Sequence, residues 1–151
     1  MLPRTYDTQV CSIARTLEVV GERWTLLILR DALLGIRRFD DFQADLGIAR
    51  NVLTDRLGRL VEAGVLERRA YSERPLRHEY RLTDKGRDLW PVVHALARWG
   101  DKHEAPGGPP RLFVHRDCGG AIDDHRICET CGAAVEVRDV QALPGPGAAA
   151  A

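Results

Sequence analysis

The sequence predicts a mainly α-helical chain with one small β-hairpin, an α+β fold, followed by a short cysteine-rich module. Apolar residues recur at helical spacing through residues 10–61. Two short strand-like runs follow at residues 65–71 and 78–83. Three of the four cysteines then fall within residues 118–131. These three patterns define two differently built parts of the chain.

Four helices are expected in the first part. Residues 10–20 form an amphipathic run, whereas residues 24–34 are apolar on nearly every side, as in a helix surrounded by others. Residues 39–46 and 53–61 predict a short third helix and a fourth, joined by a tight turn. Glycines close the four runs: Gly21, Gly35, Gly47 and Gly64.

A hairpin and a last helix complete the first part. Residues 72–77 form a charged tip between the two strand-like runs. Thr83 is the expected N-cap of a long final helix. One side of that helix is lined by Leu89, Val92, Val93, Leu96 and Trp99. A helix-turn-helix followed by a hairpin is the winged helix-turn-helix arrangement.

Composition predicts the domain boundaries. Five of the six residues at 105–110 are proline or glycine, which indicates a linker. The linker separates a winged-helix domain at residues 1–104 from a small module at residues 111–142. Residues 143–151 are almost all Pro, Gly and Ala, so we expect a disordered tail.

Length and charge set limits on the function. The 151 residues carry 22 basic and 22 acidic side chains, so net charge neither favours nor excludes a nucleic-acid partner. No window is long and apolar enough for a membrane span, and the first residues do not resemble an export signal. We therefore expect a cytoplasmic protein without a membrane partner.

The fourth helix has the polarity of a DNA-recognition helix. Its apolar residues predict one buried face, and polar side chains that suit base edges and phosphates occupy the rest. Residues 47–78 hold seven arginines against four acids, a local excess of +3. The candidate DNA-binding residues are Arg50, Asn51, Thr54, Asp55, Arg56 and Arg59 on the helix, with Arg74, Arg77 and His78 on the hairpin. The alternative is that these residues do not bind DNA, and form only a solvent-exposed helix face and an ordinary charged turn.

Several sequence blocks in this order resemble the HxlR family of bacterial winged-helix transcriptional regulators, over about residues 8–102. The blocks are Cys11, GERWTLLIL at 21–29, RFDDF at 38–42, LTDRL at 53–57, EYRLT at 79–83 and Gly86. The resemblance implies a homodimer, built by the first and last helices, on a palindromic double-stranded DNA operator. It places Arg50, Asn51, Thr54 and Arg56 at the DNA, and residues 74–78 in the wing. Many relatives have Ser where this chain has Ala49, so one helix cap and phosphate contact is expected to be missing.

Dimerisation is also expected from the last helix, which has more apolar surface than a small winged domain covers. The alternative is that Trp90 and Trp99 pack on the first two helices of their own chain. A MarR-like regulator is a neighbouring class, but its dimer is built by longer terminal helices.

The module predicts a structural zinc site held by His115, Cys118, Cys128 and Cys131. Two turns that each end in Cys-Gly predict a zinc-ribbon-like arrangement with four protein ligands and no open position for water. About 30 residues with few large apolar groups bury too little apolar surface to stabilise a fold, so a bound metal is expected to stabilise the module. His125 is an alternative nitrogen ligand, and a Cys128–Cys131 disulfide or unpartnered thiols are the remaining alternatives.

Cys11 stands apart, near the start of the first helix, where the helix dipole favours a thiolate. Some HxlR-like regulators sense oxidants or electrophiles at the matching position, so redox sensing by Cys11 is one hypothesis. A small buried hydrophobic residue is the alternative.

An enzyme is not expected. A zinc deaminase needs a His-x-Glu element and a proline before its first cysteine, and the sequence has neither. The function predicted is a sequence-specific DNA-binding regulator, a homodimeric repressor released by an unknown small-molecule or redox signal. The alternative function is a winged-helix and zinc-ribbon adaptor that binds proteins and no operator.

Overall fold

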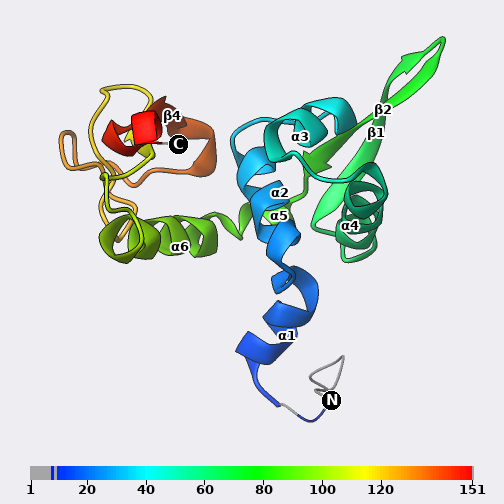
Figure 1. Cartoon of the computed structure of the whole chain (residues 1–151), viewed down its shortest axis with the longest axis horizontal. Helices are drawn as coiled ribbons and strands as arrows, with labels where there is room; N and C mark the ends of the chain where they lie inside the picture. Colours follow the sequence, from blue (N-terminus) through cyan, green and yellow to red (C-terminus); the bar gives the residue numbers. More distant parts are fainter. Residues whose placement is uncertain (1–7, 9, 151) are drawn as a thin grey trace. The chain divides into compact units, whose positions relative to one another are not determined.

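A computed structural model describes residue 8 and residues 10–150 (Figure 1). The chain divides into two compact units, Met1–Gly86 and Arg87–Ala151. Each unit is described by itself. No helix of the described residues is both long and apolar enough to cross a membrane.

The first unit is the expected winged helix-turn-helix fold, which confirms the predicted α+β class. Its helices are α1 (Ser12–Val20), α2 (Arg23–Leu33), α3 (Phe39–Leu46), α4 (Arg50–Glu62) and the short α5 (Asp84–Arg87). Helices α2, α3 and α4 enclose the core, whereas α1 projects away from them (Figure 1). The largest fully buried side chains come from α2, α3, α4 and the start of the hairpin: Ile28, Leu29, Phe42, Leu53, Leu57, Leu60, Val65 and Leu66.

The wing is the antiparallel hairpin of β1 (Leu66–Glu73) and β2 (Leu76–Leu82), whose tip projects beyond α3 and α4 (Figure 1). The Tyr80 amide donates to the Arg37 carbonyl at 2.7 Å, which ties the base of β2 to the loop before α3. The base of the wing is thus fixed to the helices, while the tip is exposed.

The long helix expected after Thr83 is interrupted. Thr83 caps α5 as predicted, since its Oγ1 accepts from the Gly86 amide at 3.1 Å. The chain then turns and starts α6 (Trp90–His103) with Pro91 in its first turn. Proline has no amide hydrogen to donate to the carbonyl four residues earlier, so it favours the beginning of a new helix over a continuous one.

The second unit contains α6 and the cysteine-rich module. The module has one antiparallel pair, β3 (Arg111–His115) with β4 (Val140–Pro144), and two short 3-10 turns, η1 (Val137–Asp139) and η2 (Pro146–Ala150). The structure differs from the expected domain division, because α6 belongs to the same unit as the module.

The end of the chain also differs from the expected disordered tail. Leu143 pairs with Leu112 and Pro144 pairs with Arg111 in the β3–β4 ladder. The Gly145 amide then donates to the Pro110 carbonyl at 2.9 Å. Composition alone predicted disorder because these residues bury little, but backbone pairing with β3 orders them.

Candidate nucleic-acid interface and metal centre

The turn between α3 and α4 sets the direction of α4. Gly47 ends α3 with a φ of 63°, a left-handed conformation that glycine adopts without strain. Ile48 is buried, and its carbonyl accepts from the Gln43 side chain at 3.5 Å. Ala49 is the N-cap of α4 and makes no side-chain cap hydrogen bond, as expected for an alanine at this position.

Helix α4 divides into a buried and an exposed face. Leu53, Leu57 and Leu60 are buried. Five of the six candidate residues on this helix are exposed, namely Arg50, Asn51, Thr54, Asp55 and Arg59. The structure thus exposes most of the predicted residues along α4, from Arg50 in its first turn to Arg59 in its last.

Ion pairs and ring contacts orient several of these side chains. Arg50 lies over the Phe39 ring, 4.6 Å from its centroid, and its Nη1 is 3.6 Å from Asp40 Oδ1. Asp55 pairs with Arg59, one helical turn away, at 3.0 Å. Asn51 makes no side-chain hydrogen bond to any residue that the structure describes, so its amide is available to a ligand.

Arg56 is less accessible than expected. Its Nε lies 2.9 Å from Glu22 Oε2, and its side chain is 22% exposed. Glu22 is itself the N-cap of α2, where Oε2 accepts from the Trp24 amide at 2.9 Å. Arg56 therefore ties α4 to the start of α2. Glu22 was not predicted as a site residue, because this contact joins residues that are far apart along the chain.

The wing presents the other predicted cations. Arg74 and Arg77 are exposed, and His78 is half-buried with its Nδ1 3.2 Å from Arg68 Nη2. Arg38, at the N-cap of α3, lies over the Tyr71 ring at 4.4 Å from its centroid. Arg38 and Tyr71 were not predicted as site residues.

A cavity of about 390 Å³ lies where α3, α4 and the wing meet. Its lining residues are Arg38, Phe39, Asp40, Asp41, Arg50, Tyr71, Arg77 and His78. Three arginines and two aspartates give the lining a small net positive charge, and the cavity brings Arg50 of α4 and Arg77 of the wing to one surface.

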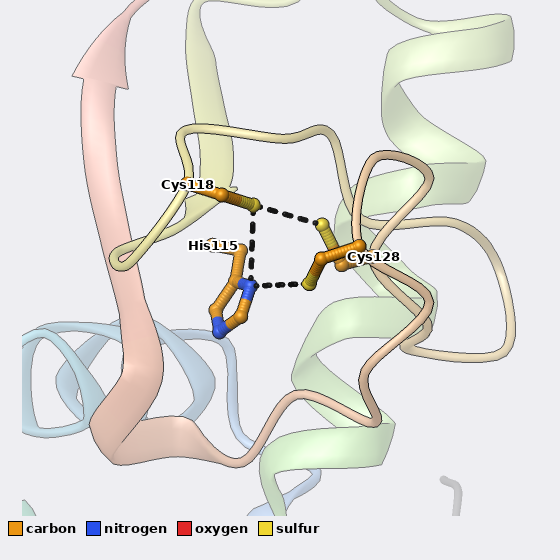
Figure 2. Close-up of side chains that lie close together, drawn as sticks. His115, Cys118 and Cys128 are labelled. Carbon is orange, nitrogen blue, oxygen red and sulfur yellow. Dashed lines mark hydrogen bonds between the residues drawn. The ribbon is translucent and has the colours of Figure 1, made fainter.

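The module brings the four predicted metal ligands together. Figure 2 shows three of them, His115, Cys118 and Cys128. One ligand atom from each of His115, Cys118, Cys128 and Cys131 lies within 4.8 Å of all the others. His115 Nδ1 is 3.5 Å from Cys118 Sγ and 3.3 Å from Cys131 Sγ. Cys118 Sγ is 3.4 Å from Cys128 Sγ.

These separations fit a metal of zinc's size. Bonds of about 2.1 Å to nitrogen and 2.3 Å to sulfur give tetrahedral edges of about 3.5–3.8 Å. The three donor separations lie close to that range. The four residues form a single group that could bind a metal.

Glycines shape the two turns as predicted. Gly119 and Gly132 follow the turns with φ values of 71° and 73°. The backbone amide of Cys131, followed by that of Thr130 and the side chains of Cys118 and His115, lowers the pKa of the Cys128 thiol to about 6, against the opposing effect of burial. The local backbone therefore favours a thiolate at Cys128, which is the form that binds metal.

Two of the alternatives for the module, His125 as a ligand and a Cys128–Cys131 disulfide, differ from the structure. His125 is not in the ligand group; its backbone amide donates to Asp123 Oδ1 at 2.8 Å. All four cysteines are free thiols, so Cys128 and Cys131 are not joined.

Cys11 lies outside both sites. It is exposed, and its Sγ caps α1 by accepting from the Ala14 amide at 3.3 Å. The alternative of a small buried hydrophobic residue is therefore wrong.

Comparisons with known proteins agree with this architecture. The HTH-type transcriptional regulator Rv3095 of Mycobacterium tuberculosis is 50% identical over 137 residues, which cover 90% of this chain and 87% of that protein. The crystal structure of PA1607, described as a candidate transcription factor, has a TM-score of 0.71 and 39% identity, covering 87% of this chain and 93% of that one. The redox regulator HypR in its oxidised form has a TM-score of 0.58 and 32% identity, covering 62% of this chain and 97% of that one.

The sequence also matches the model of a protein family. The model of the HxlR-like helix-turn-helix matches residues 19–107, more than half of the chain. The matched residues include α2, α3, α4 and the wing, which carry the candidate nucleic-acid interface. The chain therefore belongs to the HxlR family of helix-turn-helix transcriptional regulators.

Proposed function

We propose that this regulator binds a palindromic operator in double-stranded DNA as a homodimer and represses transcription until a signal releases it. The observation that carries the proposal is the exposed polar face of α4, backed by a fully buried leucine face. A helix divided in this way can enter the major groove while it remains anchored to its own domain. The role is non-enzymatic, and binding to chromosomal DNA would place the protein in the cytoplasm.

The proposed contacts divide into two kinds. Asn51 and Arg59 project from α4 toward base edges, where Asn suits adenine and Arg suits guanine. Arg50, Thr54 and the wing cations Arg74 and Arg77 contact phosphates. Arg56 positions α4 through its ion pair with Glu22.

Exposed apolar residues on α1 and α6 support a dimer. Val10, just before α1, is 87% exposed, and Ile13 on α1 is 73% exposed. On α6, Leu96 is 51% and Trp99 is 60% exposed. Two helices with such faces are suited to burial against a second copy, whose twofold symmetry matches that of a palindromic operator.

Selection of duplexes from a random DNA pool by the full chain, followed by fluorescence-anisotropy titration, tests the DNA proposal. If the complex makes six to ten phosphate contacts, affinity falls roughly 10³- to 10⁵-fold between 50 and 200 mM salt. Arg77→Ala should weaken binding and reduce the salt slope, while the matched control Arg138→Ala, an exposed arginine of the module, should do neither. Wild-type affinity in Arg50→Ala and Arg77→Ala would favour the protein adaptor instead.

We propose further that the ligand group holds structural Zn²⁺. The donor set of one histidine and three cysteines is typical of structural zinc, and all four positions are supplied by protein. Protein purified without chelators should contain one zinc per chain by elemental analysis. Cys131→Ser should lower that content, whereas Cys11→Ser should not. A zinc-free wild type contradicts this proposal and leaves the DNA proposal standing.

The releasing signal is proposed to act through Cys11 or through an unidentified small molecule. The exposure of Cys11 and the similarity to HypR, which is a redox regulator, support a thiol-based signal. Oxidants or quinones should release wild-type protein from the selected duplex but not Cys11→Ser, in which serine preserves the helix cap. Equal release of both proteins would exclude Cys11.

A further inference from the structure

The metal ligands differ in their access to solvent. Cys118 and Cys131 are exposed, while Cys128 and His115 are buried. Cys118 Sγ lies 3.4 Å from Cys128 Sγ (Figure 2), and Cys118 is exposed whereas Cys128 is buried. An oxidant can therefore reach one thiolate of the pair, and the second lies within range to react with the product.

The module depends on these ligands for its fold. Its own buried apolar residues are few and small: Val114, Ile122, Cys128, Val135 and Val140. Outside the β3–β4 ladder, the loops that carry the cysteines are held by turns, such as the one in which the Cys128 amide donates to the Ala133 carbonyl at 2.9 Å. Loss of the ligand cluster should therefore loosen the loops that the cluster organises.

Those same loops hold one side of α6. Trp90 Nε1 donates to the Val135 carbonyl at 3.3 Å, and His94 Nε2 donates to the Asp123 carbonyl at 2.8 Å. Arg98 Nε pairs with Asp124 Oδ1 at 2.6 Å. The three α6 residues are spaced four apart, so they form one stripe along the helix. Trp90 and His94 are buried against the module.

The helix needs this support. A helix of 14 residues is marginal in water by itself, and α6 has exposed apolar residues on its other side. Asp123 and Val135 lie close along the chain to Cys128, and the Val135 amide donates to the Arg126 carbonyl at 2.8 Å. The ligand cluster and the docking of α6 are therefore parts of one packed structure.

We infer that the metal–thiolate centre is an oxidation site that controls the packing of α6. Peroxide oxidises the Cys118 thiolate to a sulfenic acid, and the Cys128 thiolate attacks that sulfur to form a disulfide. Two thiolates, one hydrogen peroxide and two protons give one disulfide and two waters; the sulfurs lose two electrons and the peroxide oxygens gain them. With two ligands consumed, metal binding is lost and the loops release Trp90, His94 and Arg98. This inference rests on the proposed zinc site.

The test uses the zinc-loaded full chain with Cys11→Ser, so that oxidation at Cys11 does not contribute. After treatment with hydrogen peroxide, a colorimetric chelator measures released zinc, and peptide mass mapping locates disulfides. Hydrogen–deuterium exchange follows the amides of residues 90–103. We expect zinc release, a Cys118–Cys128 disulfide and exchange over 90–103 faster by at least about tenfold. Thiol reductant with added zinc should reverse all three.

The variant Arg98→Ala removes a contact between α6 and the module without changing any of the metal ligands. Arg98→Ala should raise exchange over 90–103 with the zinc content unchanged, whereas the matched Arg138→Ala should leave exchange at the wild-type rate. Zinc release with no change over 90–103 would overturn the inference, as would zinc retained after oxidation or a disulfide other than Cys118–Cys128. Protein without zinc before treatment would instead show that the metal proposal itself fails.

Discussion

Among single residues, Asp31 of α2 has the most unfavourable environment for its charge. It is fully buried, its Oδ1 accepts from Arg30 Nε at 2.9 Å, and its Oδ2 has no hydrogen-bond partner among the described residues. Burial raises the pKa of Asp31 to about 6, although the charge of Arg30 opposes this shift. The carboxyl group is therefore protonated in the folded state over a pH range in which the unfolded chain is ionised.

This shift predicts a dependence of stability on pH. Between about pH 6 and pH 4, the folded state binds a proton that the unfolded state does not, so lowering the pH should stabilise the wild type relative to Asp31→Asn. The expected relative gain is about 1–2 kcal/mol. Urea unfolding of both proteins across this pH range measures this gain. Subtracting the unfolding free energy of Asp31→Asn from that of the wild type removes the effect of the other titratable groups, which the two proteins share. Parallel curves for the two proteins would show that Asp31 keeps an ordinary pKa.

Gly120 limits the size of the side chain that can lie beside the ligand cluster. A Cβ at this position would lie 2.5 Å from Cys128 Sγ and 2.6 Å from Thr130 Oγ1. Gly120→Ala should therefore displace the Cys128 sulfur and weaken zinc binding, which competition with a chelator measures. Gly100→Ala is the control, since nothing lies within 4 Å of its added Cβ. Equal zinc affinity in both variants would mean that the sulfur can shift without cost.

At the scale of the elements, α6 is the helix with two roles. One stripe packs on the module, and Val92, Leu96 and Trp99 are exposed. Helix α1 likewise has exposed apolar residues. Exposed apolar residues at helical spacing are expected on a helix whose apolar face is buried when another protein binds.

A charge placed on the exposed side of α6 should disrupt the proposed dimer. Leu96→Asp should raise the dimer dissociation constant by about a hundredfold or more, because the carboxylate would be buried without a partner. Sedimentation velocity over a concentration series measures the change. Leu76→Asp is a matched control, since Leu76 is 64% exposed at the tip of the wing. If both variants dimerise like the wild type, the interface lies elsewhere.

The elements that the sequence predicted best are those with regular apolar spacing. Helices α2, α3 and α4 begin and end close to the predicted residues, because leucines and phenylalanines at helical spacing are followed by glycine. The break before α6 was missed because the apolar pattern continues through it, while Pro91 sets the start of the new helix. Strand β4 was missed because its order comes from backbone pairing with β3, which side-chain composition does not encode.

The parts of the candidate sites that depend on local sequence were predicted better than those that depend on contacts between distant segments. The four candidate metal ligands were predicted from residue type and short spacing, and the structure brings all four together. On α4, the division into buried and exposed residues was also found. The tie between Arg56 and Glu22, and the stacking of Arg38 on Tyr71, join distant segments and carry no local signal in the sequence.

For the whole molecule, the proposed reading of a palindromic operator requires a symmetric pair of chains. A regulator with one α4 per chain can read a palindrome only if two copies present their helices to the same duplex. The exposed polar face of α4 and the exposed apolar residues of α1 and α6 are the two features that such an assembly requires. The cysteine-rich module contributes by contacting α6 at Trp90, His94 and Arg98.

Hydroxyl-radical footprinting of the full chain on a duplex selected from a random pool can test whether two α4 helices read the DNA. We expect two equivalent protected regions, related by the symmetry of the selected sequence, with centres about 10 base pairs or a multiple of that apart. Asn51→Ala should weaken both regions together. A single unsymmetrical protected region, or protection that Asn51→Ala and Arg50→Ala leave unchanged, would contradict the claim that two α4 helices read the DNA.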